Sequence, residues 1–265
     1  MRFEGKRVIV TGAARGIGHA IAAAFLSEGA DVYAVDRNAE GLELLARDLG
    51  DERLRTGVAD LSSVAEARHM VDEGIGELGG LDVLVNNAGV MPDGAILDVS
   101  PETFDAAFSV NARAPFFAMQ RAAEHMIEHG GGAFVNVASA NAFRVESPEA
   151  PYNASKAALV MLTRAFAHEL GHLGIRANCI APGETLTPEE RASASAHDIE
   201  RERAYLERVP LRRLGKPEDQ AKVVLFLASE EAAFVSGETI LVDGGELTGD
   251  WWDRDDAPPI PDAPL

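Results

Sequence analysis

Short apolar, strand-like runs alternate with helix-forming segments along most of the chain, and this alternation is the strongest constraint on its fold. The strand-like runs occupy residues 7–12, 31–36, 54–60, 81–89, 132–139, 175–183 and 238–245. Most are apolar throughout instead of alternately apolar and polar, which is typical of parallel strands covered on both faces. Parallel strands joined by right-handed helical crossovers form a doubly wound sheet. We therefore predict an α/β fold, a Rossmann-type seven-stranded parallel sheet with helices on both faces.

The segments between these runs predict the helices and the limits of the domain. Helices are expected at residues 16–28, 39–49, from about 62, 101–129, 151–172 and 217–228. The 265 residues contain no internal repeat and no linker, so residues 1–249 are predicted to form a single domain. Residues 184–210, rich in Ala, Ser and Glu, are expected to form a mobile helical lid. The acidic, Pro-rich tail at 250–265, with Trp251 and Trp252, predicts either disorder or an anchor on a neighbouring subunit.

Composition narrows the range of partners and compartments. The formal net charge of −19 would repel nucleic acid and anionic membranes, so neither is expected as a partner. Cys179 is the only cysteine, which argues against an intrachain disulfide and a thiolate metal site, and we expect no metal. We recognise no signal peptide and no membrane-spanning run, so a cytoplasmic location is expected.

A glycine-rich stretch, TGAARGIG at residues 11–18, lies between the first strand and the first helix. Gly12, Gly16 and Gly18 allow a tight turn and a close backbone approach, and the helix N-terminus that follows offers unpaired N–H groups to a diphosphate. Arg15 and Ile17, between these glycines, would border the same ligand. A plain turn from strand to helix is the alternative interpretation of this stretch alone.

Asp36, at the end of the second strand, supports the nucleotide interpretation and indicates which dinucleotide binds. It lies 20 residues after Gly16, where a carboxylate would accept hydrogen bonds from the ribose of adenosine. Because the same charge would repel the additional ribose phosphate of NADP, NAD is expected as the cofactor. Arg15 and Arg37 favour the opposite preference, since either could contact a phosphate.

Tyr152 and Lys156, in the stretch PYNASKAAL at residues 151–159, are the candidates for acid–base chemistry. Residues four apart share one face of a helix, so the two side chains are predicted to be neighbours. A lysine ammonium stabilises a phenolate and lowers the tyrosine pKa from its ordinary value of about 10, which would suit Tyr152 to proton transfer. Ser139 ends the fifth strand, at the sheet edge where ligands bind, and is expected to hold the substrate oxygen. A Tyr–Lys pair on a helix surface is the alternative for the spacing alone.

Four motifs follow one another along the chain. They are T-G-x-x-x-G-x-G from residue 11, NNAG at 86–89, Y-x-x-x-K at 152–156, and PG at 182–183 followed by a threonine at 187. Together they resemble the short-chain dehydrogenase/reductase family, and the resemblance extends from Arg7 to Gly245. It implies an oxidoreductase with a nicotinamide cofactor that commonly assembles as a homotetramer.

The resemblance also implies roles for individual residues. Asn111, in the helix after the fourth strand, would complete a proton relay with Ser139, Tyr152 and Lys156. The implied cofactor contacts, besides Tyr152 and Lys156, are Asp60, Leu61, Asn87, Ala88, Gly89, Pro182, Gly183, Thr185 and Thr187.

The segments that set substrate selectivity in that family contain polar residues, or polar and apolar residues together, in this chain. They correspond to residues 90–96, 140–151 and 184–210. The substrate contacts expected from them, besides Ser139 and Tyr152, are Asn141, Phe143, Val145 and Glu184. This mixture does not describe a strongly apolar tunnel, so we expect a small polar hydroxy compound such as a sugar, a polyol or a cyclic alcohol.

The sequence thus predicts an NAD-dependent oxidoreductase that transfers a hydride between nicotinamide and a secondary alcohol or ketone, with Tyr152 as acid and base. Two alternatives stay open: an NADP-dependent carbonyl or 3-oxoacyl reductase, and a non-catalytic module that binds NAD. Such a module would not need Ser139, Tyr152, Lys156 and Asn111 together.

Overall fold

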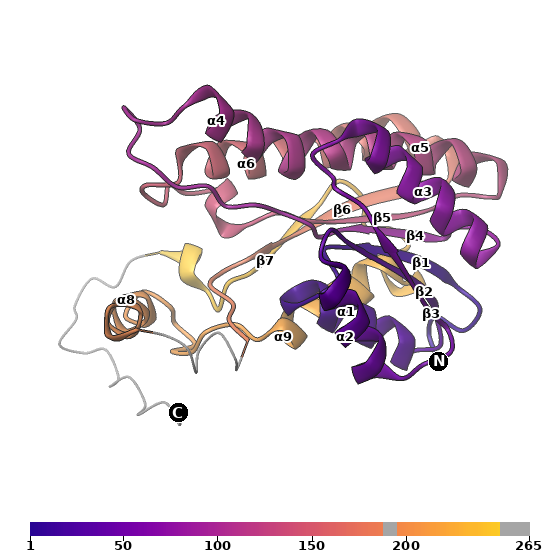
Figure 1. Cartoon of the computed structure of the whole chain (residues 1–265), viewed down its shortest axis with the longest axis horizontal. Coiled ribbons are helices and arrows are strands. Elements are labelled where there is room, and N and C mark those ends of the chain that lie inside the picture. The colour runs from indigo at the N-terminus through magenta and orange to yellow at the C-terminus, as the bar shows by residue number, and fades with distance from the viewer. Residues whose placement is uncertain (188–194, 250–265) are drawn as a thin grey trace.

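Seven parallel strands form the centre of the protein, as the apolar runs predict (Figure 1). The computed structural model describes residues 1–187 and 195–249. The strands are β1 (Arg7–Thr11), β2 (Asp31–Asp36), β3 (Leu54–Val58), β4 (Val83–Asn86), β5 (Gly132–Val137), β6 (Ile175–Pro182) and β7 (Thr239–Val242). Their order in the sheet is β3-β2-β1-β4-β5-β6-β7, so the direction of winding reverses between β1 and β4. The predicted fold class is confirmed.

Helices cover both faces of this sheet (Figure 1). One face carries α1 (Gly16–Ser27), α2 (Ala39–Leu49) and α9 (Pro217–Ala228). The other carries α3 (Val64–Leu78), α5 (Ala114–Glu128) and α6 (Ala150–Leu170), with α4 (Pro101–Phe108) packed along α6. The helices therefore divide the apolar residues into two cores, one on each side of the sheet.

The side chains of β1 show why the strands are apolar throughout. Val8 and Val10 lie in the core under α1 and α9, whereas Ile9 lies in the core under α3 and α5. All three side chains are fully buried. Because neighbouring residues of a strand point to opposite faces, a strand with helices on both sides has no position for a solvated side chain.

Capping side chains explain why several predicted helix ends are correct. Asn38 accepts a hydrogen bond from the backbone N–H of Gly41 at 3.1 Å and begins α2, which ends at Gly50 in the left-handed conformation. Ser63 accepts from the N–H of Glu66 at 3.4 Å and begins α3. Short polar side chains at the N-cap and glycine after the last turn are the ordinary signals for helix ends.

The single helix expected at residues 101–129 is interrupted. Between α4 and α5 the chain forms one wider, π-helical turn at Ser109–Arg113. Pro115 has no backbone N–H to continue the α-helical ladder back to the carbonyl of Asn111. The interruption places Asn111 in a buried turn, and π turns of this kind are frequent at functional sites.

The two segments predicted to lie outside the strand–helix alternation are described only in part. A helix, α8 (Ala196–Leu206), occupies the middle of the expected lid, and residues 188–194 of that lid lie outside the described residues. The tail at 250–265, with Trp251 and Trp252, also lies outside them. The lid function and the role of the tail therefore stay predictions. No helix in the described part of the chain is both long and apolar enough to cross a membrane.

The packing of β5 generates a stability prediction. Phe134 is fully buried and contacts Phe166 of α6, with ring centroids 6.0 Å apart. Replacing Phe134 by Ala should lower the free energy of unfolding in urea by about 3–5 kcal/mol, because the change removes buried area and leaves a cavity. Phe234, which is fully exposed, is the matched control, and Phe234→Ala should cost less than about 0.5 kcal/mol. Equal losses in the two variants would contradict this account of the core.

Candidate functional site

Two adjoining cavities open at the carboxyl ends of the central strands. The first, here called the glycine-loop cavity, has a volume of about 470 Å³ and is lined by Gly12, Ala14, Arg15, Gly16, Ile17, Gly18, Asp36, Arg37, Asn38, Ala59, Asp60, Leu61 and neighbouring residues. The second, the tyrosine cavity, has a volume of about 440 Å³ and contains Ser139, Tyr152 and Lys156. Ile17, Asn87, Gly89, Val90 and Thr185 line both. In a doubly wound sheet, ligands bind where the strand order reverses, which here is the edge between β1 and β4.

The loop between β1 and α1 fits a diphosphate. Gly12 adopts a positive φ of 64°, and a side chain there would approach the Cα atom of Ala88 to 2.7 Å. A side chain at Gly18 would collide with the carbonyl oxygen of Gly12 and lie 2.5 Å from Nδ2 of Asn87. Among the described residues, no side chain caps the N-terminus of α1 and its first turn contains no acid. Its backbone N–H groups are thus suited to an anion.

The Asp36 carboxylate is held in a fixed position at the end of β2. One of its oxygens accepts a hydrogen bond from the N–H of Ala14 at 3.1 Å, and the other from the N–H of Asn38 at 3.0 Å. The exposed Arg37 lines the same cavity. Asp60 also lines this cavity, and hydrogen bonds from Ser62 lower the pKa of its carboxyl group. A carboxylate and a guanidinium therefore both face the region expected for the adenosine.

Asn87 connects β4 to β1. Its Nδ2 atom donates to the carbonyl oxygens of Thr11 and Gly12, at 2.9 and 3.0 Å, and its backbone N–H donates to Oγ1 of Thr11 at 3.0 Å. The same residue lines both cavities. Asn87 thus braces the centre of the sheet, and it lies where a cofactor would pass from one cavity to the other.

Lys156 is buried beneath the Tyr152 ring. Its Nζ atom donates to the carbonyl oxygen of Val137 at 2.8 Å and lies 5.8 Å from the centre of the Tyr152 ring. Burial lowers the pKa of Lys156 to about 8, because it disfavours the charged ammonium. At neutral pH most of the lysine therefore keeps its proton.

The pKa of Tyr152 differs from the sequence-based expectation. In the protein alone it is raised above its ordinary value, and burial is the main cause. The Ser139 hydroxyl acts in the opposite direction, and the negative charge of Glu149 adds to the increase. The decrease in the Tyr152 pKa that its spacing from Lys156 led us to expect is therefore absent in the protein alone, where burial of the phenol dominates.

Ser139 and Asn111 occupy different positions relative to the tyrosine cavity. Ser139 lines it, directly after β5, and its Oγ atom accepts from the N–H of Asn141 at 3.1 Å. Asn111 is fully buried and lines neither cavity. Its Nδ2 atom donates to the carbonyl oxygen of Val90 at 2.8 Å and to Oγ of Ser155 at 2.9 Å.

Asn111 and Lys156 both lie close to Gly89. A side chain at Gly89 would lie 3.3 Å from both Oδ1 of Asn111 and Nζ of Lys156. The Asn111 amide and the Lys156 ammonium therefore both border the small space beside Gly89, although Asn111 lines neither cavity.

The structure brings most of the predicted site residues together. Every predicted cofactor contact except Thr187 lines one of the two cavities. Of the predicted substrate contacts, Asn141 and Glu184 line the tyrosine cavity with Ser139 and Tyr152. Phe143 and Val145 do not line it and are largely exposed, at 49% and 83%. The turn after β5 directs these two side chains away from the cavity.

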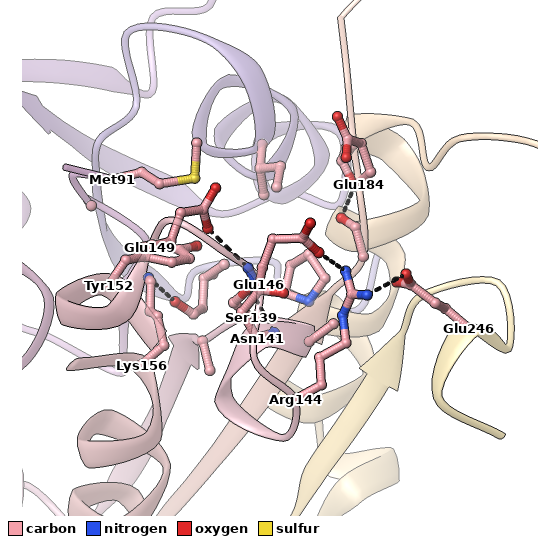
Figure 2. Close-up of a pocket in the computed structure, with 18 of the residues that line it drawn as sticks. Met91, Ser139, Asn141, Arg144, Glu146, Glu149, Tyr152, Lys156, Glu184 and Glu246 are labelled. Carbon is pink, nitrogen blue, oxygen red and sulfur yellow. Dashed lines mark hydrogen bonds and ion pairs between the residues drawn. The ribbon is translucent and has the colours of Figure 1, made fainter. Parts of the chain in front are cut away.

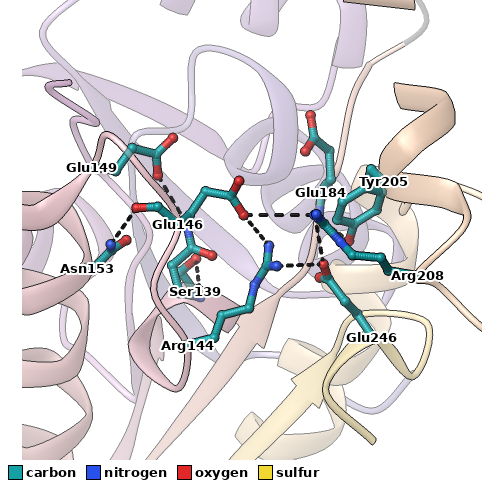
Figure 3. Close-up of polar contacts among 10 residues, drawn as sticks. Ser139, Arg144, Glu146, Glu149, Asn153, Glu184, Tyr205, Arg208 and Glu246 are labelled. Atoms are coloured by element: carbon teal, nitrogen blue, oxygen red, sulfur yellow. Dashed lines mark hydrogen bonds and ion pairs between the residues drawn. The ribbon is translucent and has the colours of Figure 1, made fainter. Parts of the chain in front are cut away.

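Charged residues that the sequence-based predictions omitted form much of the tyrosine cavity (Figure 2). They include Arg144, Glu146, Glu149 and Glu246. The Arg144 guanidinium lies 2.6 Å from Oε2 of Glu146 and 3.0 Å from Oε1 of Glu246, and Arg208 lies 3.5 Å from the same Glu246 oxygen (Figure 3). Arg144, Glu146 and Glu149 lie in the 140–151 segment that was expected to contact the substrate. Glu246 comes from a distant segment, and only tertiary contacts bring it to the cavity.

The glycine loop generates a binding prediction. Gly18→Ala should weaken NADH binding by at least about tenfold, because the new methyl group separates the loop from Asn87. Gly76→Ala in α3 is the matched control, since a side chain there meets no neighbouring atom within 4 Å. Titration of NADH fluorescence would measure both dissociation constants. Unchanged binding in Gly18→Ala would show that this close approach does not shape the site.

Comparisons with known proteins agree with this geometry. The family described as Enoyl-(Acyl carrier protein) reductase matches residues 12–246. The chain is 38% identical to the 3-oxoacyl-acyl-carrier-protein reductase FabG of Thermotoga maritima, covering 92% of this chain and 99% of the relative. It is 37% identical to the D-threitol dehydrogenase of Mycolicibacterium smegmatis, covering 92% and 94%.

A solved structure provides a third comparison. A short-chain dehydrogenase from Burkholderia cenocepacia in complex with NADP superimposes with a TM-score of 0.84 at 36% identity, covering 93% of this chain and 99% of that chain. The chain therefore belongs to the short-chain dehydrogenase/reductase family and is an NAD(P)-dependent oxidoreductase that acts on CH–OH or carbonyl groups.

Proposed function

We propose that the protein uses NAD to interconvert a secondary alcohol and its ketone, and that its substrate is a small polar hydroxy compound. The observation that carries this proposal is the convergence of Ser139, Tyr152 and Lys156 in one cavity that adjoins the glycine-loop cavity. A bound nicotinamide supplies the hydride acceptor for oxidation and the hydride donor for reduction. The protein positions the substrate and handles the proton.

Tyr152 is the proposed acid and base. In oxidation its phenolate accepts the hydroxyl proton of the substrate, so that the alcohol O–H bond breaks and the phenol O–H bond forms. In reduction the phenol returns a proton to the new alkoxide. Ser139, at the end of β5, donates a hydrogen bond to the substrate oxygen and keeps it within reach of Tyr152.

Lys156 and Asn111 are the proposed supporting residues. The bond from Lys156 to Val137 fixes the ammonium beneath the Tyr152 ring, where its charge stabilises the phenolate. Asn111 borders the same space beside Gly89 as Lys156 and is proposed to complete the path by which the proton reaches solvent.

The cofactor preference follows from Asp36. Its carboxylate is fixed by two backbone N–H groups in the glycine-loop cavity and would face the ribose of adenosine, where it accepts hydroxyl hydrogen bonds and repels a phosphate. Arg37 in the same cavity, together with the NADP-bound relative, favours NADP as the second candidate.

The substrate class follows from the charged wall of the tyrosine cavity. Glu146, Glu149, Glu184 and Arg144 surround the space beside Tyr152, which suits a hydroxylated substrate better than an acyl chain. The similarity to a D-threitol dehydrogenase supports this choice. The similarity to a 3-oxoacyl reductase supports the alternative, an NADP-dependent carbonyl or 3-oxoacyl reductase. A screen of polyols, cyclic alcohols and 3-oxoacyl thioesters with each cofactor tests the two directly.

Assembly and location are further parts of the proposal. A homotetramer is the assembly expected from the family resemblance, and light scattering of the full-length protein would test it. A cytoplasmic location is likewise a prediction, which cell fractionation would test. A non-catalytic module that binds NAD is the third candidate function, and it would bind the cofactor without turning over any alcohol or ketone.

The proposed role of Tyr152 predicts a large kinetic effect. Tyr152→Phe should lower kcat by about a hundredfold or more, because the ring stays in place while the proton carrier is lost. Tyr33→Phe is the matched control, since Tyr33 lines neither cavity, and it should keep nearly full activity. Comparable turnover in Tyr152→Phe and the wild type would contradict the assignment.

The pH profile provides a second readout of Tyr152. Oxidation requires the phenolate, and the raised pKa of Tyr152 moves that form to alkaline pH, so the oxidation rate should rise as pH increases above neutrality. Reduction requires the phenol and should keep its rate at neutral pH but lose it in the same alkaline range. Opposite pH limbs for the two directions, measured by NADH absorbance, would support the role.

The role of Asp36 predicts a change in cofactor preference. Asp36→Ala should lower kcat/KM for NAD by about tenfold, because the ribose loses a charge-assisted hydrogen bond, and should leave kcat/KM for NADP equal or higher. Asp48→Ala, a change in α2 outside both cavities, is the control. A wild-type preference for NADP, or an unchanged ratio in Asp36→Ala, would favour the second candidate cofactor.

A further inference from the structure

Glu149 lies one helical turn before Tyr152 and lines the same cavity. It is the residue before α6, and only 8% of its surface is exposed. Figure 2 shows Glu149 next to Tyr152 and on the opposite side of the cavity from Glu246. Desolvating a carboxylate next to a group that must itself become negative is unfavourable, so its presence at this position calls for a function.

Hydrogen bonds fix the Glu149 carboxylate relative to Ser139. Asn141 donates from Nδ2 to Oε2 of Glu149 at 3.1 Å, and from its backbone N–H to Oγ of Ser139 at 3.1 Å. Asn141 thus links the Ser139 hydroxyl, which would hold the reacting oxygen, to the Glu149 carboxylate. A substrate bound to Ser139 and Tyr152 would present its neighbouring carbon atoms to Glu149.

The chemistry of a carboxylate defines what it can recognise. An ionised carboxyl group only accepts hydrogen bonds, and it can accept up to about four. It can therefore hold Asn141 and a substrate donor together. Among donors it favours a protonated amine over a hydroxyl, and it repels a carboxylate.

We propose that Glu149 is a specificity-determining residue that binds a second hydrogen-bond donor of the substrate, on the carbon next to the reacting CH–OH group. This inference rests on the proposed function. It narrows the substrate class to vicinal amino alcohols and vicinal diols, and it ranks the amine above the hydroxyl. An isolated secondary alcohol should be a poor substrate, and a hydroxy acid the poorest.

The other charged groups of the cavity agree with this ranking. Arg144 is paired with Glu146 and Glu246, so a substrate anion would compete with two carboxylates for it. From the remaining elements that face the cavity, α6 contributes Lys156, the segment after β6 contributes Glu184 and α8 contributes Tyr205. The cavity therefore contains more acidic than basic side chains.

Glu149 also acts through Tyr152. Its negative charge raises the pKa of the Tyr152 phenol. Glu149 therefore opposes proton removal from a substrate that has no hydrogen-bond donor for its carboxylate. A substrate ammonium next to Glu149 would offset that charge during the reaction. The discrimination should therefore be seen in kcat as well as in KM.

Glu149→Gln separates charge from shape. Glutamine keeps the length of the side chain and a carbonyl oxygen for Asn141, but it carries no charge. The probes are cyclohexanol, its vicinal diol, the vicinal aminocyclohexanol and the vicinal hydroxy acid, each oxidised with NAD at neutral pH. We expect the wild type to prefer the amino alcohol over cyclohexanol by about tenfold or more in kcat/KM, and Glu149→Gln to lose that preference.

Two further variants and a pH profile complete the design. Glu149→Asp keeps the charge and should keep part of the preference for the amine. Glu128→Gln removes an exposed charge at the far end of α5 and should change neither the preference nor the activity. In Glu149→Gln the alkaline limb of cyclohexanol oxidation should shift to lower pH, an effect that a merely structural role would not produce.

The outcomes distinguish this inference from the proposed function. If the wild type oxidises cyclohexanol or a polyol but Glu149→Gln leaves the ranking and the pH limb unchanged, the role of Glu149 is wrong and the proposed function stands. If the wild type oxidises neither the cyclohexane probes nor the alcohols of the substrate screen, both the role of Glu149 and the proposed function are wrong. If Glu149→Gln unfolds in a thermal melt, the ratio of kcat/KM for the amino alcohol to that for cyclohexanol in Glu149→Asp decides whether Glu149 sets the preference. A wild-type preference for cyclohexanol over the amino alcohol would overturn the inference by itself.

Discussion

The close approach of the β1–α1 loop to the end of β4 is the contact on which both cavities depend. Gly12 and Gly18 leave no room for a side chain, because the backbone of Ala88 and the amide of Asn87 occupy that space. Asn87 then donates to the carbonyl oxygens of Thr11 and Gly12. The contact lies where the strand order reverses, so one set of hydrogen bonds joins the ends of β1 and β4 and forms the wall shared by the two cavities.

Burial has opposite consequences for the two proposed proton-handling groups, and the difference explains how they depend on each other. It lowers the pKa of Lys156 and raises that of Tyr152, since it disfavours the charged form of each. In the protein alone Tyr152 is therefore ready to act as an acid. For the proposed base role, the positive charge of an oxidised nicotinamide ring would add to that of the Lys156 ammonium and favour the phenolate. The proposed direction of proton transfer would thereby be coupled to the oxidation state of the bound cofactor.

The strands and most helix ends could be predicted because their signals are local. The seven apolar runs require burial on both faces. Asn38 and Ser63 mark helix starts through their capping side chains, and Gly50 marks a helix end through its left-handed conformation. The glycine loop, Asp36 and the Tyr152–Lys156 spacing were equally local. The π turn at Ser109–Arg113 was missed, because its helical periodicity continues on both sides and only Pro115 signals the interruption. The raised pKa of Tyr152 was missed because burial is a property of the whole fold.

The charged wall of the tyrosine cavity could not be predicted, because tertiary contacts assemble it. Arg144 precedes α6, Arg208 follows α8, and Glu246 follows β7, yet both guanidinium groups meet the same glutamate oxygen. The Glu246 side chain is only 2% exposed, and burial of its charge is tolerated because these cations compensate it.

That ion-pair cluster also holds the loop that leads into α6 and therefore the helix start that carries Glu149 and Tyr152. The consequence is a link between selectivity and positioning. An anionic substrate would compete with Glu146 and Glu246 for Arg144, and displacing either carboxylate would loosen the support of the residue that is proposed to move its proton. A substrate that leaves the pairs intact and places its own donor against Glu149 keeps the helix start in position. Selection against anions in this site would then follow both from the charge of Glu149 and from the ion pairs that hold the cavity together.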